Sequence, residues 1–79
     1  MALSEKGREL SKKIALLMRE KNFSSEAQEF ILMMSHAKDM TAKTGTSEKA
    51  KEIILDCVKN ANSEQEVIDK ILFFMGLEK

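Results

Sequence analysis

A chain of 79 residues is long enough for one small domain, and its 13 basic and 13 acidic side chains leave no net charge. Such a chain has no overall field to attract nucleic acid or anionic lipid. Hydrophobic residues make up 43% of it, too many for a disordered chain. We expect neither a signal peptide nor a membrane-spanning helix. The lone Cys57 cannot form an internal disulfide, so we expect a cytoplasmic protein.

The spacing of apolar residues predicts four helices, at about residues 4–21, 25–43, 47–60 and 64–76. In the first, Ser4 is the expected N-cap, and Asn22 can take the left-handed conformation that ends a helix. The apolar stripe of this helix consists of Leu3, Leu10, Ile14, Leu17 and Met18. A basic face of Arg8, Lys12 and Arg19 lies opposite that stripe.

The second predicted helix is apolar over most of its circumference, because five large apolar residues follow one another from Phe30 to Met34. A helix of that kind must be covered on more than one side, so we expect it at the centre of the fold. The helix is expected to begin at Ser24 or Ser25, with Ser25 and Gln28 matching a capping box, and Gly45 is expected to stop it. Its main stripe is Ala27, Phe30, Ile31, Met34 and Ala37, with Met33 and Met40 to one side.

The last two predicted helices are also amphipathic and have clear N-terminal signals. Thr46 or Ser47 is the expected N-cap of the third, and Ser63 with Glu66 forms a capping box before the fourth. The third helix is expected to bury Ala50, Ile53, Ile54, Cys57, Val58 and Ala61. The fourth is expected to bury Val67, Ile68, Ile71, Leu72, Phe74 and Met75, which leaves Phe73 and Leu77 pointing elsewhere.

Loops of two to five residues favour antiparallel neighbours. We therefore predict a single all-α domain over residues 1–79, folded as a small four-helix bundle of antiparallel up-down-up-down topology. The alternative is a pair of helical hairpins that cross at a steep angle.

No constellation in the sequence implies a chemistry. His36, the only histidine, lies on the polar side of its helix, and no nucleophile pairs with it. Met33, Met34, His36 and Met40 contain donors for copper(I), but helical spacing turns Met34 away from the others. We therefore expect no catalytic residues, no metal site and no cofactor, and the chain is not expected to be an enzyme.

Several apolar residues are left outside the predicted core stripes, namely Leu16, Leu32, Leu55, Phe73 and Leu77. Phe73 and Leu77 are one helical turn apart and would form a patch, and flexible methionines such as Met33 and Met40 suit adaptable contact surfaces. We therefore expect a protein-interaction module of the inhibitor, immunity, chaperone or regulatory-subunit type. It would bind a protein partner, or itself, through the second and fourth helices.

The alternative function is a nucleic-acid-associated regulator that uses Arg8, Lys12 and Arg19. Against it, the fourth helix opens with Glu64 and Glu66, which would face the phosphate backbone. The carboxylates of the first helix also dilute its positive charge. We therefore expect the chain to bind neither nucleic acid nor membranes.

Overall fold

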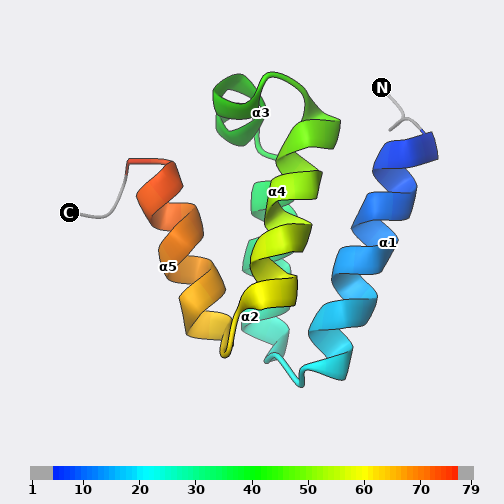
Figure 1. Cartoon of the computed structure of the whole chain (residues 1–79), viewed down its shortest axis with the longest axis vertical. Helices are drawn as coiled ribbons and strands as arrows, with labels where there is room; N and C mark the ends of the chain where they lie inside the picture. The colour runs from blue at the N-terminus through cyan, green and yellow to red at the C-terminus, as the bar shows by residue number, and fades with distance from the viewer. Residues whose placement is uncertain (1–4, 77–79) are drawn as a thin grey trace.

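The structure is a computed structural model that describes residues 5–76, and within them it contains five helices and no strand (Figure 1). The helices are α1 (Glu5–Glu20), α2 (Ser25–Ser35), α3 (Lys38–Thr44), α4 (Ser47–Asn60) and α5 (Glu64–Phe74). The all-α class is confirmed. Ser4, the predicted first N-cap, lies outside the described residues.

Most helix ends follow the local signals of the sequence. Asn22 has φ 61° after α1, and Gly45 has φ 102° after α3, so both take the left-handed region that ends helices. The N-caps of α2, α4 and α5 are Ser24, Thr46 and Ser63. Their hydroxyls accept hydrogen bonds from the backbone N–H groups of Ala27 at 3.2 Å, Lys49 at 3.0 Å and Glu66 at 3.3 Å, respectively.

The predicted helix over 25–43 is wrong, because the chain breaks between α2 and α3. Ala37 is extended, with ψ 139°, and the backbone carbonyl of Ser35 accepts a hydrogen bond from Nζ of Lys51 at 3.1 Å. A cation at the C-terminal end of a helix interacts favourably with its dipole and satisfies a carbonyl that has no partner within the helix. The break redirects α3 and turns the Met40 side chain into the core, where it is 1% exposed.

The packing of the four longer helices differs from the predicted antiparallel arrangement. Their directions do alternate along the chain, but α1 makes its most extensive contact with α4, and the two run in the same direction (Figure 1). Near the start of both helices, Lys6 Nζ lies 3.0 Å from a Glu52 carboxylate oxygen. Near their ends, Lys21 Nζ donates to the carbonyls of Lys59 and Ala61 at 3.0 and 2.9 Å.

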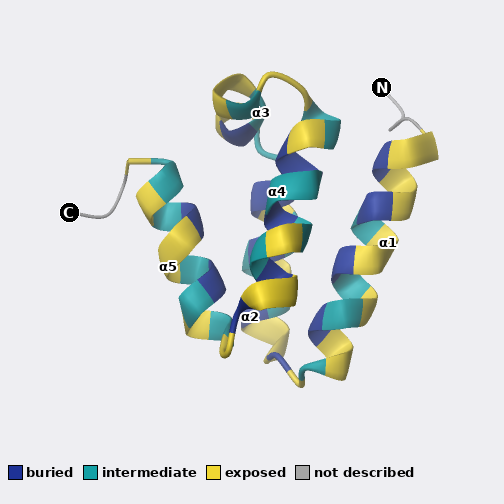
Figure 2. Ribbon diagram, viewed as in Figure 1, coloured by how far each residue is buried: buried dark blue, intermediate teal, exposed yellow. Residues whose placement is uncertain are grey.

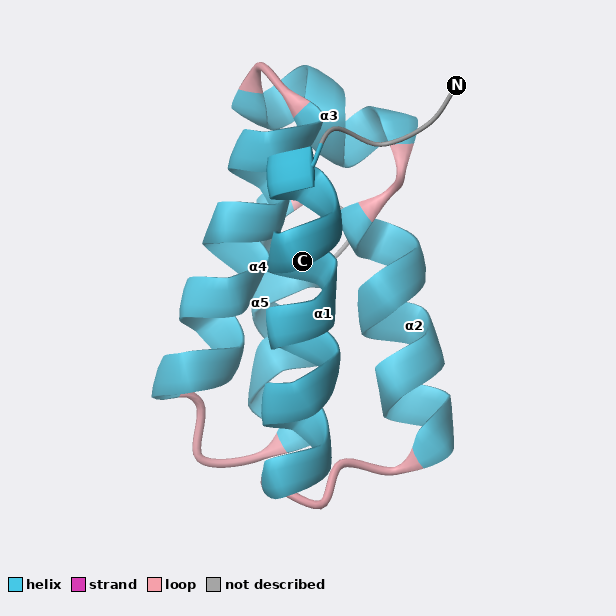
Figure 3. Cartoon of the chain, turned by 90° about the vertical axis from the view of Figure 1, so that its right-hand side faces the viewer, coloured by secondary structure: helices cyan, strands magenta, loops and turns pink. Residues whose placement is uncertain are grey.

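The helices α2 and α5 are likewise parallel neighbours, and the α1–α2 hairpin packs against the α4–α5 hairpin. Short α3 lies across one end of the molecule, and the loops that join α1 to α2 and α4 to α5 lie at the other end (Figure 3). At the loop end, the Glu64 carboxylate accepts hydrogen bonds from the backbone N–H and the hydroxyl of Ser24 at 2.7 and 3.0 Å.

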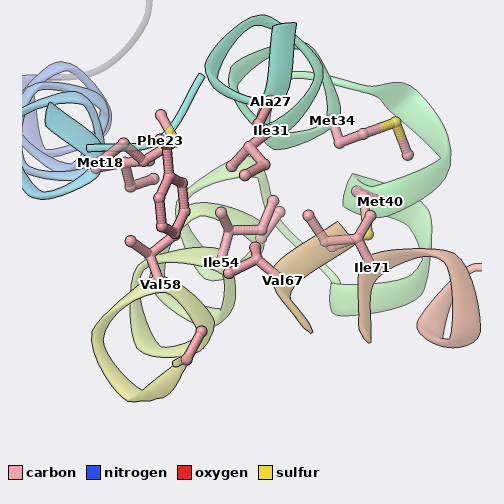
Figure 4. Close-up of a cluster of buried hydrophobic side chains, with 13 residues drawn as sticks. Met18, Phe23, Ala27, Ile31, Met34, Met40, Ile54, Val58, Val67 and Ile71 are labelled. Atoms are coloured by element: carbon pink, nitrogen blue, oxygen red, sulfur yellow. The ribbon is translucent and has the colours of Figure 1, made fainter. Parts of the chain in front are cut away.

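All five helices contribute to one core, which their buried faces share (Figure 2). The side chains of Ile14, Ile31, Ile54, Val58 and Val67 are completely enclosed. The Phe23 ring fills the corner between α1 and α4, beside Met18 and Val58 (Figure 4). Over residues 5–76, none of the helices combines the length and the apolar run needed to cross a bilayer.

Candidate protein-contact surfaces

Phe73, on the last turn of α5, is the most exposed large hydrophobic side chain that the structure describes, at 74%. Its neighbours in sequence take the opposite side: Ile71 is buried and Phe74 packs against the core. On the helix surface Phe73 adjoins the exposed Asp69 and Lys70, four and three residues earlier. The predicted outward position of Phe73 is confirmed.

The other three predicted contact residues, Met33, Met40 and Leu77, differ in where they lie. Met33, on α2, is 61% exposed and so belongs to the surface, as predicted. Met40 does not, because the α2–α3 break places it in the core beside Met34 and Ile71 (Figure 4). Leu77 lies outside the described residues. Because α2 and α5 are adjacent and parallel, Met33 and Phe73 both lie toward the C-terminal ends of neighbouring helices.

A second apolar surface, which the sequence analysis did not predict, lies between α1 and α4. We call it the α1–α4 groove; its volume is about 360 Å³, and its lining consists of Lys13, Leu16, Leu17, Glu20, Leu55 and Lys59. Leu16 is 57% exposed, while Leu17 and Leu55 are partly buried and pack against the core. The signal was present, since Leu16 and Leu55 both fall outside the predicted core stripes. An antiparallel bundle, however, would have placed their helices on a diagonal.

The predicted basic face is also present on α1. Arg8, Lys12 and Arg19 are all exposed, and within the described part of the chain none of them lies in an ion pair. None of these three cations is among the side chains that line the α1–α4 groove, whose lysines are Lys13 and Lys59. The basic face and the groove therefore adjoin on α1, since Lys12 and Arg19 each lie about one helical turn from Leu16.

A polar hollow of about 500 Å³ lies at the loop end of the molecule, between the α1–α2 and α4–α5 connections. Its two charged side chains are already engaged. Lys21 donates to the last carbonyls of α4, and Glu64 accepts from Ser24 at the start of α2. These bonds hold the two hairpins together, so we assign the hollow a structural role.

Lys51 is the one ionisable side chain enclosed completely among the described residues. Burial lowers its pKa from the ordinary 10.5, and the nearby Glu48 carboxylate opposes that shift. Burial, followed by the positive charge of Lys51, lowers the pKa of His36 as well. The pKa of the half-buried Cys57 thiol is raised, chiefly by burial. A thiol with a raised pKa is a poor nucleophile at neutral pH.

The described residues bring together no set of three or more His, Cys, Asp and Glu side chains that could hold a metal ion. The chain matches no family model, and neither its sequence nor its fold gives a significant match to a curated protein or a solved structure. A function for this chain therefore has to be argued from its own residues and surfaces.

Proposed function

We propose that this chain is a non-catalytic protein-interaction module, of the inhibitor, immunity, chaperone or regulatory-subunit type. It binds a protein partner through apolar side chains on α2 and α5, with Phe73 as the anchor. The observation that carries the proposal is the 74% exposure of Phe73 on a helix whose other face is packed. Aromatic anchors of this kind dominate the binding energy of many interfaces.

The energetic reason is the apolar area that Phe73 leaves in water. A mostly exposed phenylalanine keeps on the order of 100 Å² of apolar surface accessible, and covering it stabilises a complex by about 2–3 kcal/mol. Met33 on the neighbouring helix is also exposed and can adjust its flexible side chain to a partner. Asp69 and Lys70 beside Phe73 would supply the polar rim.

Site-specific photocrosslinking in the source cells tests the proposal. A benzophenone amino acid replaces Phe73 in one variant and Lys12, exposed on α1, in the matched control. We expect position 73 to capture a protein that position 12 does not, and Phe73→Ser to abolish co-purification of that protein. Identical crosslinking patterns at the two positions would contradict the proposal.

The alternative function, a nucleic-acid-associated regulator, has one observation in its favour. The exposed Arg8, Lys12 and Arg19 have no carboxylate partners among the described residues, so their charge is available to phosphates. Salt separates the two functions, because phosphate binding weakens steeply as salt rises and an apolar interface does not.

A further inference from the structure

The break between α2 and α3 lies where the local sequence favours a helix. No glycine or proline occurs over residues 35–39, and Ala37 at their centre is of the best helix-forming type. Both helix ends at the break are weakly capped. Helix α2 ends at His36 in a right-handed conformation, without the left-handed glycine or asparagine that follows α1 and α3. Ala37 caps α3 with no side-chain hydrogen bond, whereas serine or threonine hydroxyls cap α2, α4 and α5.

Two contacts with the rest of the molecule hold this break in place. Nζ of Lys51, on α4, donates to the Ser35 carbonyl at 3.1 Å, and Met40 is the residue that α3 buries in the core. The first contact encloses an ammonium group, which loses its hydration, so part of the stabilisation is offset. Tertiary contacts therefore oppose the local preference of the backbone at this place. A conflict of that kind brings two conformations of one segment close in free energy.

We propose that the segment from α2 to α3 is a two-state element, and that the chain also populates a conformation in which one continuous helix covers residues 25–43. We call this conformation the continuous form, and the broken form is the one in which α2 and α3 are separate helices (Figure 1). The proposal goes beyond the function above, because it concerns the backbone of α2 and α3 and holds whether or not Phe73 binds a partner.

The continuous form satisfies the backbone groups at the break within a single helix. The Ser35 carbonyl accepts the backbone N–H of Asp39 in place of Nζ of Lys51. The first three N–H groups of α3 have no partner one turn earlier within that helix, and they gain carbonyl partners when the helix is continuous. Lys51 is then released from α2, so its ammonium group can regain contact with water.

The connection to α4 is long enough for the continuous form. Helix α4 contacts α2 and runs antiparallel to it, with Lys51 beside Ser35 (Figure 1). At a rise of about 1.5 Å per residue, the continuous helix ends about 12 Å beyond Ser35, and α4 begins about 6 Å beyond it. Packed helix axes lie about 8–10 Å apart, so the gap to close is about 11 Å. The four residue steps from position 43 to position 47 span up to about 13 Å. Helix α4 can therefore keep its place.

Chemical-exchange saturation-transfer NMR of the full chain tests the proposal, because it detects a minor conformation and reports its chemical shifts. We expect a minor state of about 0.1–10% with helical Cα shifts at His36 and Ala37. Ala37→Asn should lower its population about ten-fold or below detection, because asparagine caps α3 in the broken form and is a poorer helix former in the continuous form. Met40→Gln should raise the population about ten-fold or more, because an amide is unfavourable in the core position that Met40 occupies.

The matched control for Met40→Gln is the same substitution at Met33. Residues seven apart share one face of a helix, so Met40 in the continuous form lies in line with Met33, which is 61% exposed. Met33 stays at the surface in both forms. Met33→Gln should therefore leave the two populations unchanged.

The proposal is overturned if the unaltered chain shows no second state. It is also overturned by a second state with coil shifts at Ala37, which would mean that α3 only detaches, or by a population that Ala37→Asn does not lower. An equal rise in Met33→Gln and Met40→Gln would likewise overturn it. The spectra of the unaltered chain and of Ala37→Asn decide the matter even if Met40→Gln fails to fold. None of these outcomes depends on what Phe73 binds.

Discussion

Lys51 shows how one side chain can determine a local structure that its own position in sequence does not reveal. It lies beside Ala50 and one turn before Ile54, at the edge of the predicted apolar stripe of its helix. The side chain is enclosed, and its Nζ holds the carbonyl at the end of α2. An enclosed ammonium loses hydration, so the charged form is disfavoured and the pKa falls.

Between neutral pH and about pH 10.5, we expect the free energy of unfolding of the unaltered chain to rise relative to that of the Lys51→Met variant. The unfolded chain keeps an ordinary lysine and binds more protons than the folded chain between the folded pKa of Lys51 and 10.5. Stability rises with pH wherever the unfolded state binds more protons. Urea unfolding as a function of pH measures the difference. Lys49→Met, at an exposed lysine of the same helix, is the control, and equal pH dependence in both variants would contradict the prediction.

The adjacent Phe73 and Phe74 should respond oppositely to the same substitution. Phe73→Ser should change the free energy of unfolding by no more than about 1 kcal/mol, as at surface sites without packing. Phe74→Ser should reduce it by about 2–4 kcal/mol, because it removes a ring that packs against the core and places a hydroxyl there. Urea unfolding of the two variants tests this, and the reverse order would mean that α5 is rotated.

At the scale of the elements, local signals predicted the helix ends well. The residues that end or cap these helices act within three or four residues of their own positions, so the sequence around each is sufficient to predict the helix end. They are Asn22, Gly45, Thr46 and Ser63. The break after Ser35 could not be predicted in this way. No glycine or proline marks it, and the group that donates to the carbonyl of Ser35 at the end of α2 is Nζ of Lys51, sixteen residues further along the chain.

The link between the two hairpins at Glu64 and Ser24 gives a test at the same scale. Glu64→Ala should lower the free energy of unfolding by about 1–2 kcal/mol, because the start of α2 loses two charge-assisted hydrogen bonds and α5 loses a carboxylate from its first turn. Gln65→Ala is the matched control, since Gln65 is exposed on the same turn and bonds only to Asp69 within α5. Equal losses in the two variants would show that the inter-hairpin bonds contribute nothing.

At the scale of the molecule, the sequence predicted the all-α class but not which helices are neighbours. An amphipathic stripe, such as Ile14 with Met18, indicates that a helix has a buried face, but it does not indicate which other helix covers that face. The pairing of α1 with α4 depends on contacts between distant residues, such as Lys6 with Glu52. For the same reason Phe73 could be predicted as a surface residue from its own helix, whereas the α1–α4 groove required two helices to be placed together.

The charge layout of the whole molecule leads to the last prediction, which concerns nucleic acid. The chain has no net charge, and its exposed basic face contains three cations on α1, Arg8, Lys12 and Arg19. Three phosphate contacts would give a slope of about −3 in a plot of log binding constant against log salt. We therefore expect fluorescence anisotropy with a labelled duplex to show only weak binding, with a dissociation constant of about 1 μM or higher at ~150 mM salt.

Within this experiment, Arg8→Glu/Lys12→Glu should remove the residual binding at low salt, and Lys13→Glu/Lys59→Glu serves as the charge-matched control on the groove. The control should retain more binding, because it leaves the basic face intact. Sub-micromolar affinity at ~150 mM salt that depends on Arg8 and Lys12 would favour the nucleic-acid function over the protein-contact function. Weak binding that both pairs of substitutions reduce equally would instead show that cations anywhere on α1 and α4 attract the duplex, with no site on the basic face.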